Sequence, residues 1–160
     1  MALLRLIDTD NTEDNEKKDY KRKPIKFYIN TNGGALADMY AISDIITNSK
    51  TPIYTYCTGY AMSSGFKIFL AGSKRFITRH TTLMYHQLST RKSGKYQDLV
   101  EDGKQLDYFQ NIIEEYVLER TIFTKEDLNK IREQKIDYYI HPNEAIELGI
   151  ADEIVNTIEF

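Results

Sequence analysis

The sequence predicts an α/β fold built from repeated β-α-β units. Two runs rich in β-branched and aromatic residues, 25–29 and 53–57, have the composition of β-strands, and each leads through a turn into a stretch with helical or apolar character. Short connections of this kind favour parallel strands joined by right-handed crossovers. With 160 residues, of which 41% are hydrophobic, the chain is long enough for one core, and we expect a single folded domain.

The N-terminal part is predicted to lie outside that domain. Residues 1–7 are mostly apolar, but Arg5 interrupts the run, which is too short for a secretion signal or a membrane span. They fit the last turns of a helix or a strand. From 8 to 23, 11 of the 16 residues are charged, which indicates a solvated loop, with a functional charged patch as the alternative. We therefore assign 1–23 to a charged N-terminal loop segment and 24–160 to the folded domain.

Composition excludes several classes of function. The net charge is −3 and the isoelectric point about 5.7, so the chain has no basic footprint for nucleic acid. Its one cysteine, Cys57, lies in a predicted buried strand, which excludes an internal disulfide and metal sites built from cysteine clusters. We expect a cytoplasmic protein without a membrane anchor, and we predict no metal or organic cofactor.

Two turns follow the first two strands and fall at one edge of the predicted sheet. The first ends in Gly33 and Gly34, ahead of a helical pattern at 36–46. The backbone N–H groups of such a pair can approach an anion closely, although a glycine pair is more often only a tight turn. The second turn spans 59–65. In open α/β sheets, ligand sites lie beyond the carboxyl ends of the strands, where both turns fall.

The second turn carries two serines, of which Ser63 is the better candidate for a nucleophile. A serine at a sharp strand-to-helix turn projects from the sheet, and the first turn of the helix supplies unpaired N–H groups and a positive dipole. Such a turn needs small residues two positions before and after the nucleophile. Ser63 has Ala61 and Gly65 at these positions, whereas Ser64 has larger residues. The alternative is that Ser63 only caps the helix.

A base for that serine is predicted at the end of a later strand. Short strand patterns occupy 74–78 and 82–85, and His86 follows the second. An imidazole there can take a serine proton near neutral pH, while a histidine that only makes hydrogen bonds at a strand end is the alternative. His80 and His141 are poorer candidates. Pattern alone does not choose the carboxylate that would orient His86.

A long helix is predicted in the second half of the chain. After a polar stretch at 89–95, apolar residues spaced for a single stripe run from about 96 to 120. A helix of this length is long for so small a domain. We expect it to project from the body and to pack on another subunit.

The remaining elements are short. Thr124 begins a capping-box pattern for a helix to about residue 134. Residues 137–140 are expected to be irregular or a strand, and a helix that begins at Pro142 ends before Gly149. We expect 150–158 to form an edge strand.

Four motifs together make the chain resemble the proteolytic subunit of the Clp protease, a family of self-compartmentalised serine peptidases with a crotonase-like fold. The turn YINTNGG is similar to the family's YINSPGG, and GYAMSSG matches the turn that bears the family nucleophile. LMYHQ matches the strand end that bears the family histidine, and DYYIHPNEAIELGIAD is similar to the stretch that opens with the catalytic aspartate. The motifs follow the family's order over about four-fifths of the chain, from 26 to 154.

The resemblance implies a fold, an activity and catalytic residues. It implies a crotonase/Clp-protease-like α/β fold with a projecting helical handle at about 96–120. It also implies catalytic roles for Ser63, His86 and Asp137. The chain is accordingly expected to be a serine endopeptidase that hydrolyses peptide bonds of unfolded proteins or peptides.

The resemblance implies an oxyanion site and partners as well. The backbone N–H groups of Gly33 or Gly34 and of Ser64 are expected to bind the oxyanion. The family assembles into stacked homo-oligomeric rings, such as a tetradecamer, and works with an AAA+ ATPase unfoldase. These partners and a peptide substrate are therefore expected here, with neither nucleic acid nor membrane.

The chain departs from the family pattern at several positions. Asn32 and Leu88 replace prolines in two turns, which loosens the turns without removing a catalytic group. Lys67 stands where the family has an apolar residue, and it is either exposed or indicates the Ser–Lys chemistry of the related signal peptide peptidases. The family's N-terminal axial loop, first strand and early helix have no counterpart before Met1. We therefore interpret the chain as N-terminally shortened, which affects pore gating and ATPase docking.

Other functions are weaker interpretations. A catalytically weak, ring-forming scaffold subunit is the main alternative, and the missing N-terminal elements motivate it. An acyl-CoA enzyme on the same fold shares the oxyanion glycines but has no use for a complete Ser-His-Asp set. Dinucleotide binding is least favoured, because no GxGxxG motif follows any strand.

Overall fold

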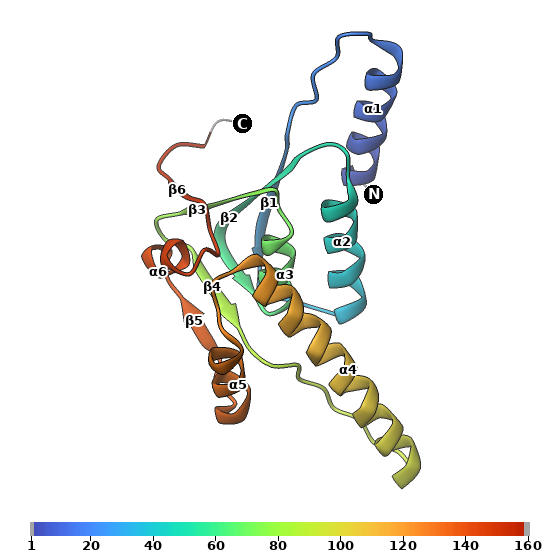
Figure 1. Cartoon of the computed structure of the whole chain (residues 1–160), viewed down its shortest axis with the longest axis vertical. Coiled ribbons are helices and arrows are strands. Elements are labelled where there is room, and N and C mark those ends of the chain that lie inside the picture. Colours follow the sequence, from blue (N-terminus) through green and yellow to red (C-terminus); the bar gives the residue numbers. More distant parts are fainter. Residues whose placement is uncertain (1, 159–160) are drawn as a thin grey trace.

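A computed structural model describes residues 2–158 of the chain. It is a six-stranded sheet with helices packed against it (Figure 1). The strands are β1 (Ile25–Thr31), β2 (Ile53–Met62), β3 (Lys74–Thr78), β4 (Thr82–Tyr85), β5 (Tyr138–Ile140) and β6 (Glu153–Val155). The helices are α1 (Ala2–Glu16), α2 (Leu36–Asn48), α3 (Ser64–Leu70), α4 (Tyr96–Arg120), α5 (Lys125–Gln134) and α6 (Pro142–Glu147).

Strand β2 organises the sheet. It pairs in parallel with β1 on one side, while on the other side its first half pairs with β3 and its second half with β4. Strand β6 extends the sheet beyond β3 in parallel, and β5 lies antiparallel to β4. The parallel strands of the predicted β-α-β units are thus present, and β2 is longer than the predicted strand at 53–57.

This register gathers the candidate site at one edge of the sheet. Met62 pairs with Met84, and Tyr85 pairs with Tyr138. Ser63 and His86 each come directly after one of these strands. Because β5 runs antiparallel to β4, the residue that precedes β5, Asp137, lies at the same edge.

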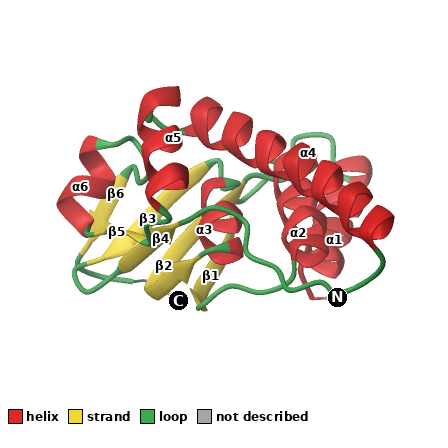
Figure 2. Cartoon of the chain, turned by 90° about the horizontal axis from the view of Figure 1, so that it is seen from below, coloured by secondary structure: helices red, strands yellow, loops and turns green. Residues whose placement is uncertain are grey.

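Helix α3 lies at the centre of the main core. It contacts β1, β2 and β4 of the sheet as well as α2 and α4, so that it is enclosed between the sheet and the longer helices (Figure 2). The core residues around it are fully or almost fully buried: Cys57, Phe66, Phe69, Leu70, Ile77, Leu83, Tyr85, Ile113 and Val117. Burial of Cys57 agrees with the prediction, and the short helix that follows Ser63 is held rigidly by its neighbours.

The loop predicted for residues 8–23 is wrong over its first half. Helix α1 extends to Glu16, and only the residues from 17 to the start of β1 lack a helix or strand. Leu3 and Ile7 lie one helical turn apart and pack against a second, smaller apolar cluster beside α2. The many acidic residues of α1 had suggested a solvated loop, but one of them, Asp10, is only 8% exposed.

Asp10 is buried because its carboxylate has three hydrogen-bond donors. Thr51 Oγ1 donates to it at 2.6 Å and Tyr20 Oη at 2.7 Å, and Arg22 forms an ion pair with it. Arg22 also pairs with Asp14 at 2.7 Å. The charges of this segment therefore neutralise one another and fasten α1 to Thr51, two residues before β2, which a composition-based prediction cannot detect.

The C-terminal edge strand is shorter than predicted. Of residues 150–158, only Glu153–Val155 form a strand, and the end of the prediction adjoins residues outside the described part. Ile150 is instead a core residue whose N–H bonds to the carbonyl of Ala145 at 2.8 Å. Asp152 then ties the segment to β3 through a 2.9 Å ion pair with Arg75.

The helices of the second half agree with the predictions. Helix α4 runs from Tyr96 to Arg120, and α5 begins with the predicted capping box between Thr124 and Asp127. In α4 only Gln110, Ile113 and Val117 are buried, all in its second half. The first half extends away from the body (Figure 1). No helix within residues 2–158 is long and apolar enough to cross a membrane.

Candidate active site

Ser63 sits in a strained turn between β2 and α3. Its backbone has φ 54° and ψ −119°, a left-handed conformation that a residue with a side chain rarely adopts. The N–H of Ser63 donates to the carbonyl of Met84 at 2.9 Å, which ties the turn to β4. The hydroxyl makes no capping hydrogen bond to α3. The alternative in which Ser63 is only a helix cap is therefore wrong.

The neighbours of Ser63 explain the small residues on either side. A Cβ at Gly65 would lie 2.4 Å from Thr31 Cγ2 at the end of β1, so a larger residue has no space there. Ala61 is completely buried. The hydroxyl of Ser64 points elsewhere and donates to the carbonyl of Gly34 at 2.8 Å. The two serines thus have different environments, and only Ser63 projects its hydroxyl toward a base.

That base is His86. Its Nε2 lies 2.8 Å from Ser63 Oγ, which is a hydrogen-bond distance. Burial lowers the pKa of His86, the positive charge of Lys67 lowers it further, and the charge of Asp137 partly opposes both. The imidazole therefore remains neutral at physiological pH and is available to accept a proton from the serine.

Asp137 lies on the other side of the imidazole. Its Oδ1 is 3.7 Å from His86 Nδ1, which is close enough for an ion pair but too long for a hydrogen bond. The Asp137 side chain is 58% exposed and that of His86 21% exposed. The structure thus joins Ser63 and His86 directly and brings Asp137 next to them without full contact.

The other two histidines lie away from the serine. His80 is exposed in the turn between β3 and β4, and His141 is exposed directly before α6. Of the three histidines, His86 is the one that lies at hydrogen-bond distance from the Ser63 hydroxyl. Within residues 2–158 no group of three histidine, cysteine or acidic residues is arranged to hold a metal ion.

The glycine turn lies against the serine turn. Gly33 has φ 110°, and a Cβ there would lie 2.8 Å from Ser63 Cβ and 2.9 Å from the carbonyl oxygen of Met62. The N–H of Gly33 donates to Thr31 Oγ1 at 3.1 Å. The N–H of Gly34, in contrast, has no acceptor among the described residues. Of the two predicted glycines, Gly34 is therefore the one whose N–H is available to an anion.

Ser64 contributes the other predicted N–H. It is the first residue of α3, and the N–H groups in the first turn of a helix have no partner within the helix. The Ser64 hydroxyl binds the carbonyl of Gly34, so the two predicted donors belong to segments that are fastened together. Sequence reasoning did not identify Thr31, whose hydroxyl fixes Gly33. The position of this threonine, two residues before Gly33, is the sequence feature from which its role could have been predicted.

A hydrogen-bond network missed by sequence reasoning connects the segment after His86 to α4 and α5. The N–H of Leu88 donates to Gln110 Oε1 at 2.8 Å, and Gln110 Nε2 donates to Glu114 Oε1 at 2.8 Å. Arg132 on α5 binds the same Glu114 carboxylate at 3.1 Å. A proline at position 88 would lack the N–H that begins this network. Gln110, a polar residue within the apolar stripe of α4, is the sequence feature from which this network could have been predicted.

Lys67 is buried rather than exposed. It retains only 3% of its exposure, and its ammonium lies 5.5 Å from the centroid of the Tyr85 ring. Burial lowers the pKa of Lys67 to about 8. The Ser63 hydroxyl bonds to His86, and the Lys67 ammonium makes no hydrogen bond within residues 2–158. The geometry is therefore that of a Ser–His pair rather than of Ser–Lys chemistry.

Comparison with known proteins finds similar proteins over most of the length of the chain. A family model described as Clp protease matches residues 15–158. The chain is 30% identical over 158 residues to the ATP-dependent Clp protease proteolytic subunit of Deinococcus radiodurans, covering 98% of this chain and 72% of that protein. It is 32% identical over 137 residues to the ATP-dependent Clp protease proteolytic subunit 1 of Prochlorococcus marinus strain NATL2A, covering 84% and 68% respectively.

A solved structure gives the same answer for the fold. A mutant of ClpP1 from Listeria monocytogenes superposes with a TM-score of 0.75 at 25% sequence identity, covering 96% of this chain and 85% of that chain. This agreement confirms the predicted crotonase/Clp-protease-like α/β fold. Because the family model covers most of the sequence and the relatives match at about 30% identity over nearly its whole length, the chain belongs to the Clp protease family.

Proposed function

We propose that the protein is a serine endopeptidase that cleaves peptide bonds of unfolded proteins or peptides. The single observation that supports this most strongly is the 2.8 Å contact between Ser63 Oγ and His86 Nε2 at a strained strand-to-helix turn. A serine hydroxyl needs such a base to become nucleophilic. Membership of the Clp protease family supports the same activity.

In the proposed reaction, Ser63 attacks the carbonyl carbon of the scissile bond. His86 Nε2 accepts the hydroxyl proton as the new C–O bond forms, and it later gives that proton to the leaving amine. A water molecule then hydrolyses the acyl-enzyme with His86 again as the base. Asp137 faces Nδ1, where it stabilises the charged imidazolium and favours the tautomer with its proton on Nδ1.

The negative charge that develops on the substrate oxygen needs donors. The N–H of Gly34 and the N–H of Ser64 are the proposed pair, because both are available beside Ser63. Gly33 is proposed to act indirectly, since its own N–H is bonded to Thr31. One donor of this kind is worth about 3–4 kcal/mol in enzymes where it has been removed. These groups complete the reaction without a metal or organic cofactor.

We propose a ring assembly as the setting for this activity. The first half of α4 has no buried residue, yet it carries Tyr96, Leu99 and Tyr108, which are 81%, 41% and 59% exposed. A second copy of the chain would cover these side chains. The names of the relatives describe an ATP-dependent protease, and an ATPase unfoldase partner and a cytoplasmic location are proposed by analogy with them.

A catalytically weak scaffold subunit is the second candidate. The observation in its favour is the 3.7 Å separation of Asp137 from His86, which leaves the imidazole without a hydrogen bond to the carboxylate. In this case the chain would assemble through α4 but turn over substrate slowly.

Sedimentation combined with a peptide assay separates the two candidates. The purified protein and Ser63→Ala are measured for particle size and for hydrolysis of a short fluorogenic peptide. We expect large particles in both samples and turnover in the wild type only, reduced by at least about 10⁴-fold in Ser63→Ala. Large particles without turnover in the wild type would favour the scaffold.

A further inference from the structure

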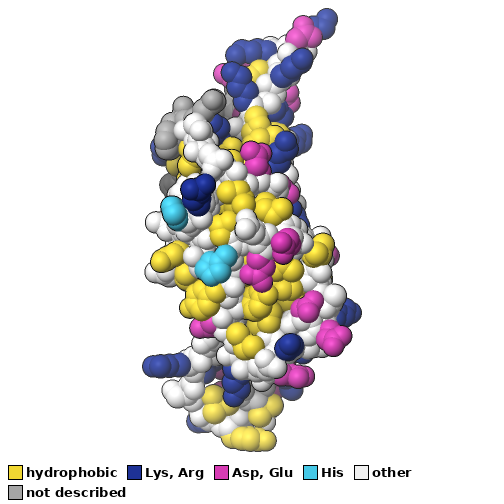
Figure 3. Space-filling view, turned by 90° about the vertical axis from the view of Figure 1, so that its left-hand side faces the viewer, with side chains coloured by type: hydrophobic (Ala, Val, Ile, Leu, Met, Phe, Trp, Pro, Cys, Tyr) yellow, Lys and Arg dark blue, Asp and Glu magenta, His cyan; other side chains and the backbone are white. Residues whose placement is uncertain are grey.

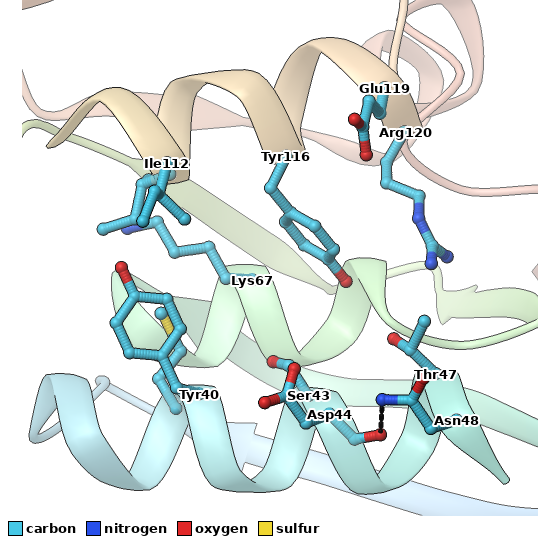
Figure 4. Close-up of a pocket in the computed structure, with 12 residues that line it drawn as sticks. Tyr40, Ser43, Asp44, Thr47, Asn48, Lys67, Ile112, Tyr116, Glu119 and Arg120 are labelled. Carbon is cyan, nitrogen blue, oxygen red and sulfur yellow. Dashed lines mark hydrogen bonds between the residues drawn. The ribbon is translucent and has the colours of Figure 1, made fainter. Parts of the chain in front are cut away.

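A pocket of about 310 Å³ lies between α2 and α4, above α3 (Figure 4). It is separate from the Ser63 turn and uses none of the residues assigned to catalysis. Its base is formed by Lys67 of α3, and exposed residues of α2 such as Asp44 and Asn48 lie at its opening. The volume is at the small end of the range for ligand sites in proteins.

Four polar groups in the wall of this pocket lack hydrogen-bond partners within residues 2–158. Lys67 is only 3% exposed as a residue, and its ammonium is bonded to no acceptor in the described part. The hydroxyls of Tyr40, Ser43 and Tyr116 are buried and have no partner there either. In Figure 4 the Lys67 ammonium and the Tyr40 hydroxyl are drawn at the same end of the pocket. Each of the four groups can donate a hydrogen bond.

Leaving such groups unpaired is costly. A buried hydroxyl without a partner loses its hydrogen bonds to water without replacement, and a buried charge loses more. Native structures therefore pair almost all buried polar groups. A set of donors that converges on a pocket without a protein acceptor indicates a ligand that supplies acceptors.

The rest of the wall restricts the kind of ligand. Met39, Ile112 and Ile113 provide an apolar surface next to the donors. Glu119 and Arg120 lie toward the other end of the view, and Asp44 lies near its lower middle, so neither acidic residue is drawn at the Lys67 ammonium (Figure 4). The donor end thus fits a single negative charge, and the apolar wall fits a hydrocarbon group attached to it.

We propose that this pocket binds a small apolar carboxylate, with its carboxylate on Lys67 and Tyr40. A short aliphatic acid and an N-acylated amino acid with a free carboxylate share this chemistry. In both cases the carboxylate pairs with the Lys67 ammonium and accepts a hydrogen bond from the Tyr40 hydroxyl. The hydrocarbon group lies against Met39 and Ile113. This site shares no residue with the proposed catalytic set and does not rest on the proposed function.

The charge on Lys67 makes binding depend on pH. The titratable groups that face it are Tyr85 and His86 from β4 and the following loop, Tyr40 and Asp44 from α2, and Tyr116, Glu119 and Arg120 from α4. Burial holds the pKa of Lys67 at about 8, so a part of the population is neutral in mildly alkaline solution. A bound carboxylate favours the charged form, and binding above this pH should therefore take up a proton.

Isothermal titration calorimetry with hexanoate tests the site. The titration uses the Ser63→Ala variant, so that no catalytic step contributes to the heat. Hexanol and hexylamine test whether the negative charge is required. N-acetylleucine and its amide distinguish a peptide-like carboxylate from an aliphatic acid. We expect saturable binding of one carboxylate per chain, no binding of hexylamine, and proton uptake at pH 8.5 from titrations in buffers of different ionisation enthalpy.

Two variants and two matched controls locate the binding. Lys67→Met keeps the length of the side chain and should weaken hexanoate binding by at least about tenfold, the loss expected for a hydrogen bond to a charged group. Tyr40→Phe should weaken it several-fold and provides the test if Lys67→Met fails to fold. The exposed positions Lys104→Met and Tyr96→Phe should bind as the parent does. Absence of saturable binding in the parent, or unchanged affinity in both pocket variants, would overturn the proposal.

Discussion

Ser63 and Gly33 show how closely two turns are packed at the scale of single residues. Ser63 adopts a left-handed backbone conformation, which costs about 1–3 kcal/mol for a residue with a side chain. Gly33 approaches it so closely that a Cβ would lie 2.8 Å from Ser63 Cβ. The strain is maintained because Met84 and Ser64 tie the two turns to their neighbours.

Substitution of the two glycines should therefore have unequal effects. Gly33→Ala forces a side chain into the Ser63 turn at φ 110°, and we expect a loss of about 1–3 kcal/mol in unfolding free energy together with a large fall in kcat. Gly34→Ala is the matched control, because a Cβ there meets nothing within 4 Å and its N–H is retained. Urea unfolding and peptide hydrolysis measure both effects. Equal behaviour of the two variants would contradict the packing described.

Lys67 influences His86 through its charge. Burial lowers the pKa of His86 first, and Lys67 adds to the effect. In Lys67→Met the imidazole stays buried but loses the neighbouring positive charge, so its pKa should rise. Because the proposed reaction needs neutral His86, the acid limb of the kcat/KM profile should move to higher pH, while Lys74→Met, an exposed control, should leave it in place. A limb that moves to lower pH would contradict this electrostatic account.

The sequence predicted the identities of these residues better than their surroundings. Ser63, His86 and the glycine turn follow from local motifs, because a turn between a strand and a helix is encoded by adjacent residues. The burial of Lys67 and the choice of Gly34 over Gly33 depend on contacts between segments far apart in the chain. Asp137 was identified only through the family resemblance, since pattern alone could not choose among many carboxylates.

At the scale of elements, α1 shows that a highly charged segment is not always a solvated loop. Burial by itself raises the pKa of Asp10, but the hydrogen bonds from Thr51, Tyr20 and Arg22 outweigh it and hold the pKa below its usual value. The strands were predictable from their β-branched and aromatic composition, α2 and α4 from the spacing of their apolar residues, and α5 and α6 from the residues at their ends. Whether an acidic residue of α1 is buried or exposed depends instead on Arg22 and Thr51, which come later in the chain.

Asp10→Asn should detach this helix in part. The substitution leaves Arg22 without its main partner, and we expect a loss of about 1–3 kcal/mol in unfolding free energy at pH 7. Because the folded-state pKa of Asp10 is below the usual value of 3.8, its contribution is present above that pH and is lost as the pH falls through the folded-state value. The two proteins should therefore converge in stability at strongly acidic pH.

Asp8→Asn provides the control for this experiment. Asp8 is exposed on the same helix and its side chain is absent from the Arg22 network. Its substitution should change the unfolding free energy by less than about 0.5 kcal/mol. A loss at Asp8 as large as that at Asp10 would show that general helix charge, and not the buried network, stabilises α1.

At the scale of the whole molecule, α4 extends well beyond the rest of the chain. The face drawn in Figure 3 has acidic and basic side chains interspersed with apolar ones, and hydrophobic side chains show at the lower end, where α4 begins in Figure 1. A helix half without buried residues gains little stability from its own domain. In the proposed ring assembly, its packing partner is another copy of the chain.

Charged residues on this half of α4 should reduce the assembly. The double variant Leu99→Asp with Tyr108→Asp removes exposed apolar surface without touching the core, so the fold should remain while sedimentation shows smaller particles than the wild type. Lys104→Asp changes an exposed charge on the same half of α4 and should leave the particle size unchanged. Particles of the same size in all three proteins would show that α4 does not mediate assembly.

Covalent labelling with a fluorophosphonate probe tests the central claim most directly, because the probe reacts with a serine that a neighbouring base has activated. Mass spectrometry of the labelled wild type should find one probe per chain, attached to Ser63. Ser63→Ala should remain unlabelled, and Ser64→Ala, which changes the adjacent hydroxyl, should still be labelled. Labelling that survives in Ser63→Ala, or that maps to Ser64, would contradict the account.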